Sequence, residues 1–172
     1  MNEQLETVDH LDRQIDDCEQ KLETLLEASA ERDLLQTLPG VGRILSAVIA
    51  LEIGDISRFE GPENLASYAG VVPAARESAR KKRRGKCPAD CNTYLKWAFV
   101  EAGNVVSLHH KKWPDRHVAQ LYQRVKQSSR MHGKATVAVA RHLAEASFWM
   151  LTKQQIYREP KAPRPALSST HG

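Results

Sequence analysis

The sequence predicts an all-α fold in which a helical arm precedes a compact helical body. Apolar side chains recur at helical spacing along the chain, and residues 3–31 contain neither Gly nor Pro. No segment shows the alternation of apolar and polar residues that is typical of a strand. A chain of 172 residues is long enough for one domain with a real core.

Residues 3–31 are predicted to form a coiled-coil helix. They are rich in Glu, Leu and Gln, which favour helix. Alternating steps of three and four residues, sustained for about three heptads, form the a/d seam of a coiled coil; the seam residues are Val8, Leu11, Ile15, Cys18, Leu22 and Leu25. We therefore expect the arm to form a homo-oligomer. A single amphipathic helix folded back on its own body is the alternative.

Charge separates the arm from the rest of the chain. Residues 1–33 hold 11 acidic and 3 basic residues, a net charge of −8, whereas residues 34–172 hold 10 and 22, a net charge of +12. The body is therefore expected to meet a polyanion. We divide the chain into an acidic arm (1–33), a helical body (34–153) and a disordered tail (154–172) that holds three prolines.

The apolar pattern predicts the elements of the body in order. They are a helix ending at 34–35, a turn at 39–42, a buried apolar helix at 43–53, a short helix at 62–70, a basic loop at 71–90, and three helices covering about 90–106, 114–133 and 135–154. Pro62 suits the first turn of the short helix, because its missing N–H has no partner there, and Gly70 suits its end.

The composition favours a soluble, cytoplasmic protein. The chain has no apolar run of about 18 residues and no basic-then-apolar leader, so we expect no membrane partner. Its three cysteines are odd in number and unevenly spread, which favours a reducing compartment. Zinc ligation by Cys87, Cys91, His109 and His110 is disfavoured, because adjacent helical residues point about 100° apart. We expect no metal or cofactor in this chain.

The sequence LPGVG at 38–42 has the form of a helix-hairpin-helix turn. Gly40 and Gly42 permit the turn and leave its amides open, at the start of a helix whose dipole favours an anion. Arg43 follows directly. Such hairpins grip nucleic-acid phosphates without reading sequence. An ordinary turn between helices is the alternative, because Pro-Gly makes those as well.

Six of the seven residues from Arg80 to Lys86 are basic. Such a run repels itself unless it faces a polyanion or bulk water, and its place between two helices favours a polyanion over a solvated loop. Together with Arg76, the candidate nucleic-acid-binding residues of this segment are Arg80, Lys81, Lys82, Arg83, Arg84 and Lys86.

Ser78 stands two residues before the basic run. A lone serine is most often a turn residue or a cap, and the chain has neither Gly-x-Ser-x-Gly nor a recognisable local triad spacing. A guanidinium cluster can, however, neutralise a phosphate ester so that a hydroxyl attacks it. The residues alone leave both interpretations open.

Several motifs in the same order resemble a known family. LPGVGRILSAVIALEIGDISRF, LASYAGVVPAARES, RRGK and CNTYLKWAFVEAG resemble the C-terminal domain of a group of bacterial insertion-sequence transposases that includes pilin-gene invertases. In that group, this serine-bearing domain follows a RuvC-like domain with four acidic metal ligands (DEDD). The resemblance is close over residues 32–105, and the arm resembles the coiled coil that joins the two domains.

This resemblance implies a DNA transposase of the bacterial nucleoid. The family's serine falls on Ser78 and implies a nucleophile that attacks DNA phosphate, beside Mg²⁺ held by the RuvC-like domain. Asn92 matches the last residue of the family motif Ser-Lys-x-Gly-Asn and joins the nucleic-acid-binding candidates. DNA and an element-encoded guide RNA are the implied partners, and residues 3–31 are expected to join either a second copy or a full-length transposase.

Two departures from the family pattern matter. Ala79 and Arg80 replace two glycines that usually follow the serine, and the sequence has no match to the DEDD domain. We therefore expect a truncated transposase that is inactive alone. Two alternatives stay open: a non-catalytic helix-hairpin-helix module that binds nucleic acid, and a coiled-coil adaptor whose basic loop docks an acidic protein.

Overall fold

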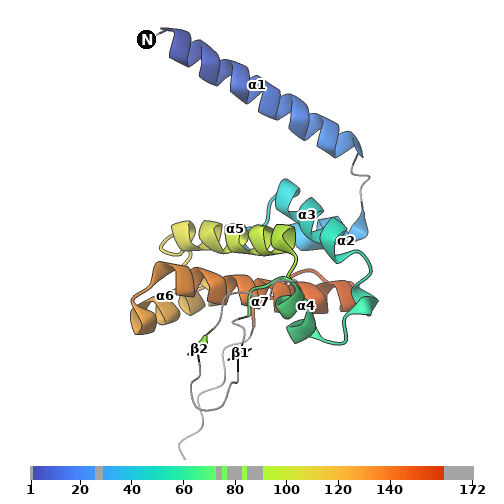
Figure 1. Ribbon diagram of the computed structural model, residues 1–172, viewed down its shortest axis with the longest axis vertical. Coiled ribbons are helices and arrows are strands. Elements are labelled where there is room, and N and C mark those ends of the chain that lie inside the picture. The colour runs from blue at the N-terminus through green and yellow to red at the C-terminus, as the bar shows by residue number, and fades with distance from the viewer. Residues whose placement is uncertain (1, 26–28, 73–74, 77–82, 85–90, 161–172) are drawn as a thin grey trace, which may run out of the picture.

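The computed structural model describes residues 2–25, 29–72, 75–76, 83–84 and 91–160 (Figure 1). Helices dominate them, so the predicted all-α class is confirmed. The elements are α1 (Asn2–Leu25), α2 (Ala30–Gln36), α3 (Arg43–Ile53), the short 3₁₀ helix η1 (Ile56–Arg58), α4 (Pro62–Tyr68), β1 (Ala75–Arg76), β2 (Arg83–Arg84), α5 (Thr93–His109), α6 (His117–Ser129) and α7 (His132–Lys153).

Helix α7 forms the centre of the body. It contacts α4, α5 and α6, and its apolar stripe is buried; the stripe comprises Ala135, Val139, Ala140, Leu143, Ala144 and Leu151. Small residues let neighbouring helices approach closely. A Cβ atom at Gly103 of α5 would lie 2.9 Å from the carbonyl oxygen of Thr136 in α7. The Ala- and Val-rich sequence of α7 is thus explained by close helix packing.

Helix α1 stands apart from this body (Figure 1). Four apolar side chains along it are at least half exposed, namely Leu5, Val8, Leu11 and Ile15. The seam is therefore not folded back onto the body, which contradicts that alternative. The helix also ends at Leu25 rather than 31, because Ser29 caps a new helix by accepting a hydrogen bond from the amide of Arg32 (3.1 Å).

Helix α3 is buried on one face only, although its mostly apolar sequence predicts a buried helix. Ile49 and Ile53 are buried, whereas Leu51 is 69% exposed and Ile44 is 44% exposed. The expectation of a buried helix was therefore right for one face only. Its outer face, like the seam of α1, presents aliphatic side chains to solvent.

The boundaries of the last elements differ from the sequence prediction. Helix α6 begins at His117 rather than Pro114, because residues 110–116 form turns whose amides bond back toward His109. It ends at Ser129, where Arg130 takes the left-handed conformation (φ 55°), and Gly133 lies in the first turn of α7 instead of at a helix end.

Part of the expected tail belongs to the body. The amide of Tyr157 donates to Thr37 Oγ1 (2.9 Å), and the Glu159 carboxylate accepts a hydrogen bond from the amide of His117 (3.0 Å). Tyr157 also packs against the core. Residues 154–160 therefore lie on the body, which corrects the tail boundary at 154, whereas 161–172 lie outside the described residues.

Candidate nucleic-acid interface

The basic segment (residues 71–90) is joined to the body at both ends by one contact between α4 and α5, which we call its base. The amide of Asn92 donates to the carbonyl oxygen of Tyr68 (2.8 Å), so the end of α4 and the start of α5 lie side by side. Gly70 takes a left-handed conformation (φ 63°), and Val71 beyond it is buried. The chain between 71 and 91 thus starts and returns at one anchored point.

Two short strands follow within the segment predicted to be a loop. Strands β1 and β2 pair antiparallel, with Ala75 opposite Arg84 and Arg76 opposite Arg83. The connection between them, residues 77–82, contains Ser78. The loop prediction is thus corrected at these four residues. Ser78 and four of the predicted cations, Arg80, Lys81, Lys82 and Lys86, lie outside the described residues.

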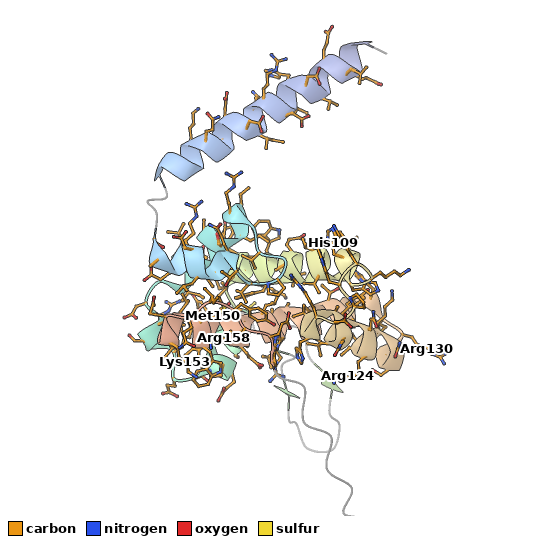
Figure 2. The ribbon with its side chains drawn as sticks, turned by 180° about the vertical axis from the view of Figure 1, so that it is seen from behind. His109, Arg124, Arg130, Met150, Lys153 and Arg158 are labelled. Carbon is orange, nitrogen blue, oxygen red and sulfur yellow. The ribbon has the colours of Figure 1, made fainter. Side chains whose placement is uncertain are left out.

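The paired strands and α1 lie at opposite ends of the molecule. In both views α1 extends from one side of the helical body, and β1 and β2 extend from the other (Figures 1 and 2). The expected oligomer seam and the expected polyanion contact therefore use separate surfaces. Each can be changed without touching the other.

Asn92 is a structural anchor of the base. Its Nδ2 donates to Glu52 Oε2 (2.6 Å) of α3 and to the Tyr68 hydroxyl (3.2 Å), and its Oδ1 accepts the amide of Leu95 (2.9 Å) as the N-cap of α5. The amide is thus engaged with protein groups on both sides. Asn92 was predicted as a nucleic-acid contact, and the structure gives it a positioning role at the root of the basic segment.

A cation missing from the sequence prediction joins this base. Arg58 lies over the rings of Phe59 (4.7 Å) and Tyr68 (4.8 Å), and its Nη2 donates to the carbonyl oxygen of Glu52 (3.1 Å). Hydrogen bonds from Asn92 and then from Arg58 lower the pKa of Tyr68. In the sequence only the pattern of an arginine next to an aromatic residue could have signalled this cluster.

The turn between α2 and α3 presents its two glycines differently. Gly40 has φ +80°, and a Cβ atom there would lie 2.3 Å from the carbonyl oxygen of Ala102, so this glycine faces α5. Gly42 is exposed with no atom near the position of a Cβ, and Arg43 is exposed at the start of α3. Any phosphate contact of this turn would therefore be made from the side of Gly42 and Arg43.

The residues considered for zinc do not gather in the part of the chain that the structure describes. No group of three or more His, Cys, Asp or Glu side chains suited to a metal occurs there. His109 and His110 each place Nδ1 at a carbonyl oxygen of α5, and Cys91 is a free thiol. Cys87 lies outside the described residues.

The comparison with known protein families decides the identification. A sequence model described as transposase, IS116/IS110/IS902 family, matches residues 32–119. The chain belongs to this transposase family. The match runs from α2 into α6 and contains the turn and the whole basic segment, so the family predicted from residues 32–105 is confirmed and the matching region extends further.

Individual relatives of this transposase family show the same likeness. The chain is 24% identical over 160 residues to an uncharacterized protein of insertion element IS116 from Streptomyces clavuligerus, covering 93% of this chain and 38% of that protein. It is 26% identical over 147 residues to the IS1111A transposase of Coxiella burnetii, covering 86% and 40%. A pilin gene-inverting protein of Moraxella bovis is 38% identical over 52 residues, covering 30% and 16%.

The chain thus spans about two fifths of the length of the first two relatives. None of the helices in the described residues is long and apolar enough to cross a membrane.

Proposed function

We propose that this chain is the nucleic-acid-binding, serine-bearing part of a DNA transposase. One observation carries the proposal: in a chain of this transposase family, the hydrogen bond between Asn92 and Tyr68 joins the two ends of an arginine-rich stretch of sequence that includes Ser78. An anchored base fixes the root of the segment, while its cations supply affinity for phosphates without selecting sequence.

The chemistry proposed for Ser78 is attack on a DNA phosphodiester. Its Oγ forms a bond to phosphorus and loses a proton, the bond from phosphorus to the leaving deoxyribose oxygen breaks, and that oxygen takes up a proton. Arginines around the serine stabilise the charge that develops on the phosphoryl oxygens. Metal ions held by the DEDD residues of a RuvC-like domain would complete such a site.

The register of the strands supports an anionic ligand for this segment. The backbone register places Arg76 opposite Arg83, so basic residues of the two strands stand at paired positions. If all six cations from Arg80 to Lys86 neutralise duplex phosphates, the logarithm of the binding constant should fall against the logarithm of salt with a slope of about −5.

A covalent adduct tests the nucleophile. The chain is mixed with a RuvC-like domain of the family, Mg²⁺, guide RNA and DNA, and the mixture is denatured in SDS. The expected result is a protein–DNA adduct that disappears in Ser78→Ala and persists in Ser128→Ala, a matched change at an exposed serine on α6. An adduct that survives in Ser78→Ala contradicts the assignment of the nucleophile.

A non-catalytic binding module is the second candidate, favoured by the replacement of the family's two glycines with Ala79 and Arg80. Under that alternative no adduct forms under any of these conditions, and Ser78→Ala binds DNA with the salt dependence of the wild-type chain. Binding that is unchanged between low and moderate salt contradicts both candidates and favours an adaptor for an acidic protein.

A further inference from the structure

An exposed tryptophan outside the basic segment is surrounded by cations. Trp113 lies in the connector between α5 and α6 and is 43% exposed. Lys112 Nζ lies 4.8 Å from its ring centroid, the Arg116 guanidinium carbon lies 5.1 Å from it, and the His109 ring lies at 5.8 Å. We refer to these four residues as the Trp113 platform.

The backbone holds the platform in place. The amides of Lys112 and Trp113 both bond to the carbonyl oxygen of His109, at 2.9 and 3.3 Å, and the amide of Arg116 bonds to the carbonyl oxygen of Trp113 at 3.3 Å. His109 in turn places Nδ1 2.9 Å from the carbonyl oxygen of Val105 in α5. The backbone of the connector is therefore ordered before any ligand arrives, which lowers the entropic cost of binding.

The platform adjoins the turn at 38–42, although the two are far apart in the sequence. A cavity of about 50 Å³ lies between them, lined by Pro39 and Gly40 on one side and by His109, Trp113 and Arg116 on the other. Such a volume holds about one or two water molecules, so it is too small for a nucleobase. A ligand would instead contact the outer surface of the platform.

The two cations over Trp113, Lys112 and Arg116, form no ion pair within the described residues, although the Glu159 carboxylate lies at the neighbouring amide of His117. Residues 109–117, HHKKWPDRH, hold three Lys and Arg and one Asp, in addition to three histidines. Cations in excess around an accessible aromatic ring are the chemistry that single-stranded nucleic acid recognises, through phosphate neutralisation and base stacking.

We propose that the Trp113 platform is a second nucleic-acid contact, specific for unpaired bases. A base stacks on the Trp113 ring or on the Arg116 guanidinium, and Lys112 neutralises a neighbouring phosphate. A duplex fits less well, because its bases are already stacked on one another. The inference rests on the proposed function, since it adds a contact for single strands to a chain proposed to bind nucleic acid through its basic segment.

The molecule contains its own matched control. Trp149 on α7 is 47% exposed and has Lys153 Nζ 4.7 Å from its ring, but a single cation lies over it and Glu145 lines the same groove. Figure 2 shows Lys153 and His109 at opposite ends of the body. Trp149, next to Lys153, and Trp113, next to His109, therefore lie on different parts of the surface. Trp149→Ala therefore removes an equally exposed ring from outside the platform.

The test is fluorescence anisotropy with labelled oligothymidylate of about 15 nucleotides, compared with a duplex of the same length. Trp113→Ala is expected to weaken single-strand binding about tenfold, within the range measured for lost stacking, and to change duplex binding less than about twofold. Trp149→Ala should leave both unchanged, and Trp113→Phe should keep most of the affinity. Lys112→Gln should reduce the single-strand salt slope by about 0.7.

Each other outcome has a definite meaning. Equal single-strand affinities of Trp113→Ala and Trp149→Ala would contradict the proposed contact at Trp113. If oligoglutamate of equal charge displaces the single strand, the surface binds anions by charge alone and base stacking on Trp113 is contradicted. If the wild-type chain binds neither the single strand nor the duplex, the proposed function is contradicted as well. Binding that is lost only in Arg83→Ala/Arg84→Ala overturns the platform alone. If Trp113→Ala lowers the thermal midpoint of unfolding, the folded variants Trp113→Phe and Lys112→Gln/Arg116→Gln test the contact instead. The proposal then requires that Trp113→Phe keeps single-strand binding and that the double variant weakens it.

Discussion

Helix α1 and the helical body carry the same kind of apolar pattern but place it differently. On α1 the side chains of Val8, Leu11 and Ile15 are half exposed, whereas Leu95 on α5 and Leu143 on α7 are completely buried. The stripes of the body pack against one another, whereas these three seam residues of α1 face solvent. A helical period therefore predicts the helix, and only the tertiary structure decides which stripe is covered.

The largest expected effect lies in the body, at the turn before α3. Gly40→Ala places a methyl group on a left-handed residue and against the carbonyl oxygen of Ala102, so it should lower the free energy of unfolding by about 2 to 4 kcal/mol. Gly42→Ala is the control, with φ −96° and open space, and should change it by less than about 0.5 kcal/mol. Chemical denaturation of the full chain measures both. Equal effects would show that Gly40 does not pack against α5.

Asn92 should show the next largest effect. Asn92→Ala removes the cap of α5 and the hydrogen bond to Glu52, and should cost about 1 to 2 kcal/mol of unfolding free energy. Asn64→Ala, at an exposed amide on α4, should cost less than about 0.5 kcal/mol in the same assay.

Asn92→Asp separates the two contributions, because a carboxylate still caps the helix but repels the Glu52 carboxylate. We expect it to be about as unstable as Asn92→Ala. Wild-type stability in Asn92→Asp would show that only the cap matters, and the base of the basic segment would then lack its link to α3.

A smaller effect depends on pH. Burial, and then the nearby His117, lower the pKa of His142, which contacts the Tyr157 hydroxyl at 3.3 Å. The unfolded chain keeps the ordinary imidazole pKa of about 6.5, so it binds the proton first as pH falls. The free energy of unfolding should therefore decrease below about pH 6.5.

Thermal unfolding between about pH 5 and 8 measures this dependence. The nearby Glu145 carboxylate partly opposes the lowering of the His142 pKa. His142→Gln should flatten the curve in this range, whereas His10→Gln on α1 removes an imidazole outside the body and should keep the wild-type curve. A curve that steepens in His142→Gln would contradict the assignment.

The sequence predicted the fold better than the site. Helical spacing located the helices of the body, but the start of α2 at Ala30 is marked by no Gly or Pro and depends on the side-chain cap of Ser29. The motif order predicted Ser78 and the neighbouring cations as site residues, and Ser78 lies outside the described residues. The contact between Glu52 and Asn92 could not be predicted, because only folding brings these residues together. The residues of the Trp113 platform lie within 109–116, but their place beside the turn at 38–42 depends on the fold.

The seam of α1 should have the smallest effect on the body and the clearest effect on assembly. Leu11→Asp/Ile15→Asp places charges in the predicted coiled-coil seam, so it should reduce the solution mass to that of one chain while the unfolding of the body stays unchanged. Sedimentation equilibrium measures the mass, and Glu6→Asp is a conservative control on the same helix.

Salt should act on the two regions in opposite directions. Two acidic arms of net charge −8 repel each other when they pair, and salt screens that repulsion, so self-association should strengthen as salt increases. Nucleic-acid binding by the basic body should weaken over the same range, because the release of counterions gains less entropy in a more concentrated salt solution. If the mass also falls with salt, the arm pairs with a basic surface instead of a second acidic arm, and the basic segment of another copy becomes its partner.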